Sequence, residues 1–200
     1  MVSLKSFAPV LASNLGMTPA AIYERQRALI RANVLPAPIG RGRGNGLSAT
    51  AETVALMVIA VMATGNLSDT DKRVKTLAGA RSVEKLAGAQ FDDWRHKTGC
   101  ALTRARDFRA ALVAILESEQ LAGAVRSVSV SRNNLAATIY FQRGRRRHIE
   151  VSNFGEQSEA IATGLKVKAE ISGDVLEAIG VALRTSCRRT PRSAAQGDKE

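Results

Sequence analysis

The sequence is poor in cysteine and has no long hydrophobic run. Only two of its 200 residues are cysteine, Cys100 and Cys187, which does not support a disulfide framework and fits a reducing compartment. The longest apolar run covers residues 54–63, whereas a membrane-spanning helix needs about 20 apolar residues. No basic stretch followed by an apolar run and a cleavage site marks the start of the chain as a secretion signal. These absences predict a cytoplasmic protein without a membrane segment.

Aromatic residues are also scarce, at 4% of the chain, although 45% of the residues are hydrophobic. The core must therefore be built mainly from alanine, leucine, valine and isoleucine. This content is enough for a real core, and the length suits one or two domains.

Acidic residues are too few to balance the basic ones. The chain has 29 Lys and Arg against 18 Asp and Glu, which gives a net charge of +11. The excess lies at the two ends, with +5 over residues 1–47 and +5 over residues 124–200, while residues 48–123 carry only +1. Because like charges repel in a compact fold, such an excess points to a polyanionic partner.

The first basic region has the pattern of two helices joined by a tight turn. Apolar residues at helical spacing predict a helix over residues 3–15, and Gly16 is a typical residue to end it. Thr18 then suits the N-cap of a second helix, with Pro19 at its first position. Asn33 suits a left-handed cap at the far end of that helix, and prolines follow it.

Such a pair of helices can read DNA as a helix-turn-helix. Ala12 is the small residue that lets the two helices approach, Gly16 supplies the turn, and the second helix faces the major groove. Its outward residues would then contact bases, with Gln26 suited to adenine and Arg27 to guanine. The outward candidates are Pro19, Ala20, Tyr23, Glu24, Gln26 and Arg27.

Residues 15–35, LGMTPAAIYERQRALIRANVL, resemble the recognition region of winged helix-turn-helix regulators of the Lrp/AsnC and MarR kind. The resemblance covers about thirty residues and implies sequence-specific DNA binding through the second helix. Asn33 stands where these regulators usually have glycine. The matching positions are Gly16, Thr18, Pro19, Ile22, Arg25, Leu29, Val34 and Leu35.

Two further basic segments are expected to contact phosphates. The Gly-rich loop GRGRGNG at residues 40–46 carries Arg41 and Arg43, which could reach a narrow minor groove. The run RGRRRH at residues 143–148 is the densest basic segment and is expected on a hairpin tip. The full set of predicted DNA-binding residues is Thr18, Tyr23, Gln26, Arg27, Arg31, Arg41, Arg43, Arg145, Arg146 and Arg147.

The rest of the chain predicts a mainly α fold with a smaller α+β region at its C-terminal end. Residues 48–122 are expected to form a helical body, with helices over residues 48–64, 70–79, 82–98 and 103–119. Residues 123–185 are expected to form a β-meander followed by a helix over residues 174–185. Residues 186–200 are polar and predicted to be a disordered basic tail.

The predicted function is a sequence-specific DNA-binding protein, with double-stranded DNA as partner and a homo-oligomeric state. A transcriptional regulator of phage or prophage type is the first interpretation. The alternatives are a DNA-packaging recognition subunit similar to small terminase subunits, and a structural or partner-binding protein. No catalytic constellation, metal site or cofactor is expected, since His96 and Cys100 are too few ligands and GRGRGNG lacks the context of a phosphate-binding loop.

Overall fold

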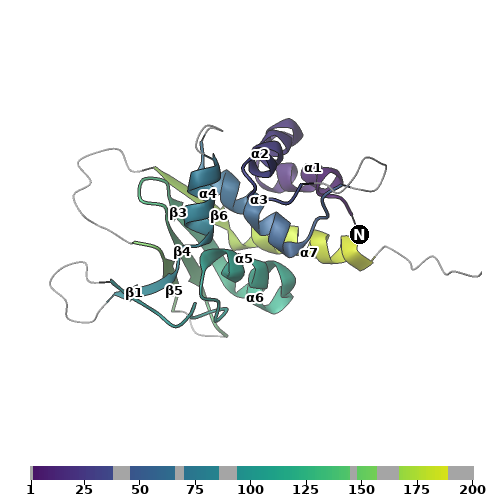
Figure 1. Ribbon diagram of the computed structural model, residues 1–200. Coiled ribbons are helices and arrows are strands. Elements are labelled where there is room, and N and C mark those ends of the chain that lie inside the picture. Colours follow the sequence, from purple (N-terminus) through teal and green to yellow (C-terminus); the bar gives the residue numbers. More distant parts are fainter. Residues whose placement is uncertain are drawn as a thin grey trace, which may run out of the picture.

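The computed structural model describes residues 2–37, 46–65, 70–85, 94–144, 148–156 and 167–188. Helices and strands are mixed along this part of the chain (Figure 1), so the fold is α+β. The helices are α1 (Leu4–Asn14), α2 (Pro19–Arg31), α3 (Ala51–Ala63), α4 (Thr70–Ala78), α5 (Phe108–Glu117), α6 (Glu119–Ala124) and α7 (Gly173–Arg188). The strands are β1 (Ser82–Lys85), β2 (Trp94–His96), β3 (Val125–Ser131), β4 (Ala136–Phe141), β5 (Glu150–Phe154) and β6 (Lys168–Ser172).

The six described strands form one antiparallel sheet in the order β2-β1-β5-β4-β3-β6. Strands β3, β4 and β5 follow one another as predicted, but β6 returns to pair with β3 rather than continuing beyond β5. The spatial order of the last four strands is therefore that of a Greek key. The predicted β-meander is correct for three strands and wrong for the fourth.

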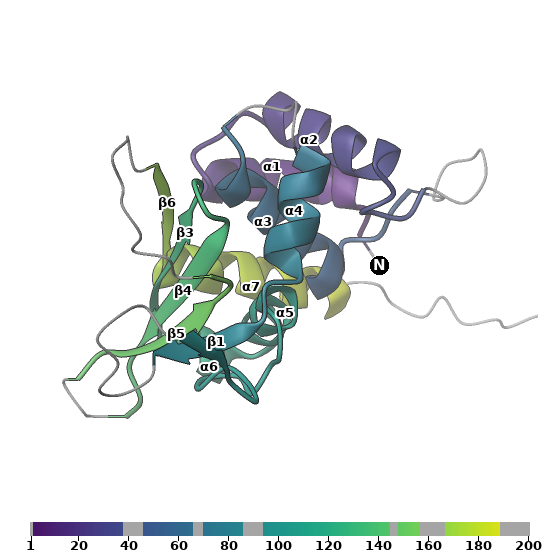
Figure 2. The ribbon, with the colours of Figure 1, turned by 60° about the vertical axis from the view of Figure 1, so that its left-hand side comes forward.

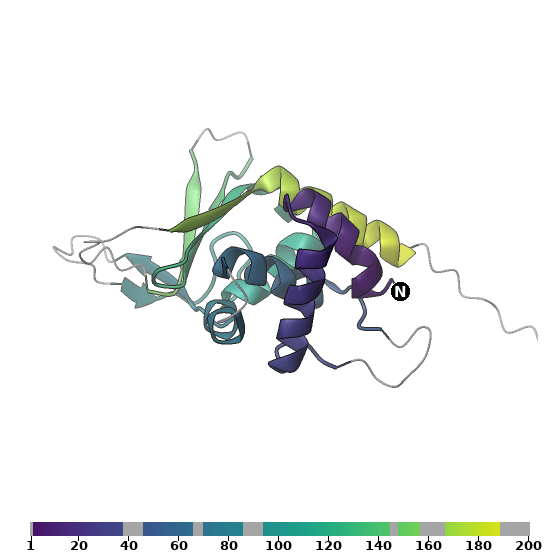
Figure 3. The ribbon, with the colours of Figure 1, turned by 90° about the horizontal axis from the view of Figure 1, so that it is seen from above.

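Helices cover one face of this sheet. Figure 3 shows the strands on one side of the molecule and the helices on the other, with the C-terminal helix α7 alongside α1. Alternate residues of the strands point into this layer, as the pleat of a sheet requires. The buried strand residues on that face include Val128, Val130, Ile139, Phe141, Phe154 and Ile171.

Helix α3 lies at the centre of the core. Its residues Val54 to Ala60 are all buried, and it contacts α2, α4, α5, β3 and β6 of the same chain. A helix that is apolar nearly all round, as residues 54–62 are, could also form an interface between subunits. Burial within the chain explains that apolar surface without a second subunit, and the homo-oligomer stays a prediction.

One hydrophobic core joins the segments that the sequence divided. It extends from Leu4 to Leu183. The predicted boundary between residues 122 and 123 lies inside α6, and β1 and β2 of the expected helical body belong to the same sheet as β3 to β6. The first three predicted segments, up to residue 185, therefore share one core.

The predicted helix over residues 82–98 is wrong. The described residues of that segment form β1 and β2, and residues 86–93 lie outside the description. Ser82 pairs with Phe154 and Val83 with Asn153 of β5. Pairing with a strand far along the chain overrides the local helical spacing. The predicted helix over residues 103–119 begins later, at Phe108 with Asp107 as N-cap, and a separate helix α6 follows it.

Gly173 sits where a side chain does not fit. A Cβ atom there would lie 2.0 Å from the carbonyl oxygen of Val125 and 2.7 Å from its carbonyl carbon. Replacing Gly173 by alanine is expected to lower the free energy of unfolding by about 1–3 kcal/mol or more, because rigid backbone must move. Urea denaturation measures this change.

Gly123 in α6 offers the matched control, since a Cβ atom there would meet nothing within 4 Å. Gly123→Ala should raise stability by up to about 1 kcal/mol, because alanine is the better helix former. Equal effects of the two substitutions would contradict the assigned packing of Gly173.

Candidate nucleic-acid interface

Helices α1 and α2 meet at a left-handed turn. Gly16 has φ +63°, a conformation that glycine adopts without strain. The amide of Met17 donates to the carbonyl of Ala12 at 2.9 Å, which is the bond that closes a Schellman motif at the end of α1. The predicted turn residue is therefore confirmed.

Both ends of α2 are also fixed by the residues that the sequence indicated. The Thr18 hydroxyl accepts a hydrogen bond from the amide of Ala21 at 3.2 Å, and Pro19 occupies the first turn. At the other end Asn33 has φ +53°, and the amide of Val34 donates to the carbonyl of Leu29 at 2.9 Å. Asn33 thus takes the place of the usual glycine, because asparagine tolerates the left-handed region.

The inner face of α2 is set by four residues at helical spacing. Ile22, Arg25, Gln26 and Leu29 are buried, and α2 packs against α1, α3 and α4. Positions three and four apart lie on the same side of a helix, so the opposite side is left for solvent. The orientation of α2 about its own axis decides which of the predicted DNA-contacting side chains are accessible.

The exposed side of α2 carries a row of polar residues one turn apart. Tyr23 and Arg27 are 38% and 54% exposed, and Arg31 is exposed as well. Lys5 in the first turn of α1 places its ammonium 5.8 Å from the centre of the Tyr23 ring. We call Lys5, Tyr23, Arg27 and Arg31 the exposed stripe. The sequence predicted three of its members; Lys5 was missed, although its position on the polar side of an amphipathic helix was visible in the pattern.

Arg27 is paired within its own helix. Its Nη1 lies 3.2 Å from Oε1 of Glu24, with both side chains about half exposed. An exposed ion pair of this kind contributes little stability, so it can open at low cost when another acceptor is offered. The pair holds the guanidinium on the outer face of α2 without burying it.

Gln26 does not belong to this surface, and its predicted outward position, on which the base-reading role depends, is wrong. Its side chain is only 6% exposed, and Oε1 has no hydrogen-bond partner within the described residues. The apolar residues Ile22, Leu29 and Ala32 alone indicate a buried face that leaves Gln26 outside. With Gln26 one helical turn from Ile22, the amide cannot reach a base while the core stays closed.

Arg25 also faces inward, toward a group of arginines at the end of α3. Nε of Arg132 donates to the carbonyl of Met62 at 2.8 Å, and Nε of Arg73 donates to the carbonyl of Ala63 at 2.9 Å. These side chains satisfy the carbonyls that a helix end leaves unpaired. Burial, and then the positive charge of Arg132, lowers the pKa of Arg25. The role of this group is structural.

The predicted basic loop lies outside the described residues, so Arg41 and Arg43 are not placed. The chain that follows it is held against the start of α1: Ser48 bridges Ser3, and the amide of Leu4 donates to the carbonyl of Leu47 at 2.6 Å. The Ser3–Ser48 bridge is therefore two residues from Lys5 of the exposed stripe. This bridge fixes the chain just after the Gly-rich loop beside the candidate interface.

The predicted basic run on the β4–β5 connection is described only at its ends. Arg145, Arg146 and Arg147 lie outside the described residues. Arg143, just before them, is exposed, and its guanidinium lies 5.4 Å from the centre of the Phe141 ring. The phosphate contacts assigned to this run stay a prediction.

The described part of the chain was compared with two further possibilities, a metal site and a membrane-spanning helix. Within it, no three His, Cys, Asp or Glu residues come together in a way that could hold a metal ion. None of its helices has the length and apolar character needed to cross a membrane. Comparison with family models, with curated proteins and with solved structures finds no match.

Proposed function

We propose that this protein binds double-stranded DNA through α2 and regulates transcription at specific sites. The observation that carries the proposal is the exposed stripe. All its residues except Lys5 lie on α2, a helix capped at both ends and preceded by a left-handed glycine turn. A helix-turn-helix needs these parts in this order. The excess positive charge of the chain supports the same class of partner.

The dimensions and chemistry of α2 suit the major groove. Its 13 residues span about 20 Å at about 1.5 Å per residue, and the groove, about 12 Å wide, admits one α-helix. Arg27 would offer a forked donor to guanine, and Glu24, released from its ion pair, would accept from cytosine. Lys5 and Arg31, at the two ends of the exposed stripe, would contact phosphates.

The two basic segments outside the described residues complete the proposed interface. Arg41 and Arg43 would contact phosphates or the minor groove, where the potential is most negative when the groove is narrow. Arg145, Arg146 and Arg147 would add phosphate contacts that raise affinity without reading sequence.

Selection from a pool of random duplexes tests the proposal, followed by genomic footprinting of the tagged protein. A regulator should enrich one sequence motif and occupy discrete promoter sites. Enrichment without a motif would limit the proposal to non-specific binding. The absence of any salt-sensitive duplex binding would contradict it and favour a structural or partner-binding protein.

Arg27→Ala is expected to weaken binding by about 1–3 kcal/mol at one base pair of the selected motif and to relax the preference there, because a bidentate contact is lost. Competition titrations with duplexes substituted at each position measure this loss.

Gln26→Ala is the informative companion, because Gln26 is buried beside the exposed stripe. It should leave the base preference unchanged, whatever it does to stability. If both variants kept the wild-type preference, α2 would not be the helix that reads the motif.

A further inference from the structure

A basic groove leads away from the C-terminal end of α2. One hollow of about 290 Å³ begins at Asn33 and Val34 and passes Lys75, Gly79 and Asp107. A second hollow of about 530 Å³ shares Gly79 and Asp107 with the first and continues past Arg81, Lys97 and Arg106. We call the two together the basic groove. Figure 2 shows α4 running from beside α2 toward β1 and α5. The second hollow is lined by residues just before β1, just after β2 and just before α5.

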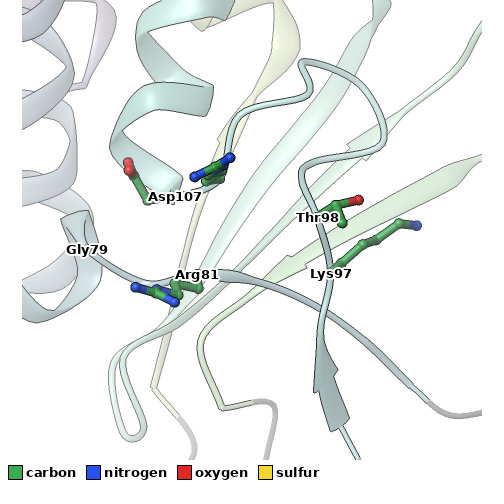
Figure 4. A pocket seen from close by; sticks show the side chains of 6 residues that line it. Gly79, Arg81, Lys97, Thr98 and Asp107 are labelled. Atoms are coloured by element: carbon green, nitrogen blue, oxygen red, sulfur yellow. The ribbon is translucent and has the colours of Figure 1, made fainter.

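Some of the cations along the groove already have acidic partners. Nζ of Lys97 lies 3.2 Å from Oε2 of Glu84, and Nη1 of Arg109 lies 3.1 Å from Oε1 of Glu52. The Asp107 carboxylate accepts from the amide of Ala110 at 2.8 Å and caps α5. In Figure 4, Lys97 extends away from Arg81, and Asp107 lies at the foot of α5. The two ion pairs and the helix cap are contacts within the protein, so these charges are already compensated or used.

Three other cations have no such partner. The side chains of Lys75, Arg81 and Arg106 are exposed and make no hydrogen bond or ion pair within the described part of the chain. All three line the same groove. The groove therefore presents uncompensated positive charge to solvent.

Backbone pairing fixes the two segments that carry Arg81 and Arg106. Residues 80–82 pair with residues 106–108: the amide of Ser82 donates to the carbonyl of Arg106, and the amide of Phe108 donates to the carbonyl of Ala80, both at 3.0 Å. The bridge sets Arg81 opposite Asp107, and Arg106 is the residue just before Asp107. Rigid backbone pairing therefore fixes the positions of both arginines along the groove that they line.

We propose that the basic groove binds the phosphate backbone of the same DNA duplex, beside the base pairs contacted by α2. This inference rests on the proposed function. The groove begins at Asn33 and Val34, directly after Arg31 at the end of the exposed stripe, so a backbone leaving α2 meets it next. Its elongated shape and spaced cations suit a chain of phosphates rather than one small anion. Phosphate contacts of this kind add affinity and fix orientation without reading sequence.

The test is a double variant, Arg81→Ala with Arg106→Ala, titrated against a fluorescein-labelled duplex of mixed sequence. Fluorescence anisotropy over a salt series gives the slope of log affinity against log salt. Each phosphate contact contributes about 0.9 to that slope on B-DNA, so the slope should become shallower by about 1.8. Binding should weaken on every sequence, and the motif preference should stay that of the wild type.

A matched control removes two exposed cations from the sheet, Arg126→Ala with Lys168→Ala on β3 and β6. It lowers the net charge by the same amount as the groove variant. Its salt slope should remain that of the wild type if the contact is local. Both double variants should melt at the wild-type temperature, because only exposed side chains are shortened.

The outcomes separate this inference from the proposed function. A groove variant with the wild-type slope would overturn the inference, and so would an equal loss of slope in the sheet control. If Arg27→Ala relaxed the base preference while the groove variant bound normally, α2 would still read DNA and only the groove would be excluded. A wild-type protein that bound no duplex at all would overturn both.

Discussion

Replacing Ile59 by aspartate is expected to abolish the folded state. Ile59 lies in the middle of α3 with 0% of its surface exposed. Helix α3 contacts three other helices and two strands. Removing an isoleucine side chain from such a site costs about 2–5 kcal/mol. An unpaired carboxylate in its place adds a desolvation cost of similar or greater size. The sum approaches the whole stability of a typical domain, about 5–15 kcal/mol.

Two further substitutions at Ile59 measure the cost of lost side-chain volume separately from the cost of a buried charge. Ile59→Val should cost about 0.5–1.5 kcal/mol, and Ile59→Ala about 2–5 kcal/mol, so both should leave a cooperative unfolding transition. Urea denaturation followed by circular dichroism measures these values. An Ile59→Asp protein with a wild-type unfolding midpoint would mean that α3 is not the centre of the core.

Local signals in the sequence predict the helix ends well. Gly16 and Asn33 adopt the positive φ that their residue types favour, and Thr50 begins α3 with a capping box that includes Thr53. Each of these features depends on hydrogen bonds between residues no more than five positions apart. A short stretch of sequence contains all the groups involved, which is why reading it in isolation succeeds.

Long-range pairing could not be predicted in the same way. Ser82 and Val83 were expected in a helix because neighbouring apolar residues have helical spacing, yet they pair with β5. The return of β6 to β3 is a similar case, since several antiparallel orders satisfy the same alternation of residues. What decides between these arrangements is burial of the whole sheet against α3, α5 and α7, which no local pattern contains.

The same contrast between local signals and long-range pairing applies to the residues of the candidate interface. Tyr23, Arg27 and Arg31 were predicted from the helical period of α2, and they are exposed as expected. Gln26 was misplaced because the period alone fixes the buried face only to within about one residue. Arg81 and Arg106 of the basic groove were not predicted at all, because the two segments that carry them pair only in the folded chain.

The largest expected effect on binding comes from removing the proposed cationic contacts in steps. The stripe variant carries Lys5→Ala, Arg27→Ala and Arg31→Ala, and the loop variant carries Arg41→Ala and Arg43→Ala. The stripe variant loses two proposed phosphate contacts, those of Lys5 and Arg31, and the loop variant also loses two. At about 0.9 per phosphate contact, each salt slope should be shallower by about 1.8, and by about 3.6 when the variants are combined. Fluorescence anisotropy with one duplex, over a salt series, measures all three slopes.

Additivity of the slopes is the decisive part of this prediction. Contacts to different phosphates release their counterions independently, so the combined loss should equal the sum of the two separate losses. Between 50 and 200 mM salt, the four phosphate contacts together should account for about a 150-fold fall in wild-type affinity that the combined variant no longer shows. A loop variant with the wild-type slope would remove Arg41 and Arg43 from the interface and leave GRGRGNG as a connecting segment. A stripe variant with the wild-type slope would remove α2 itself, because Lys5, Arg27 and Arg31 are the cations that its outer face and the adjoining turn of α1 present to solvent.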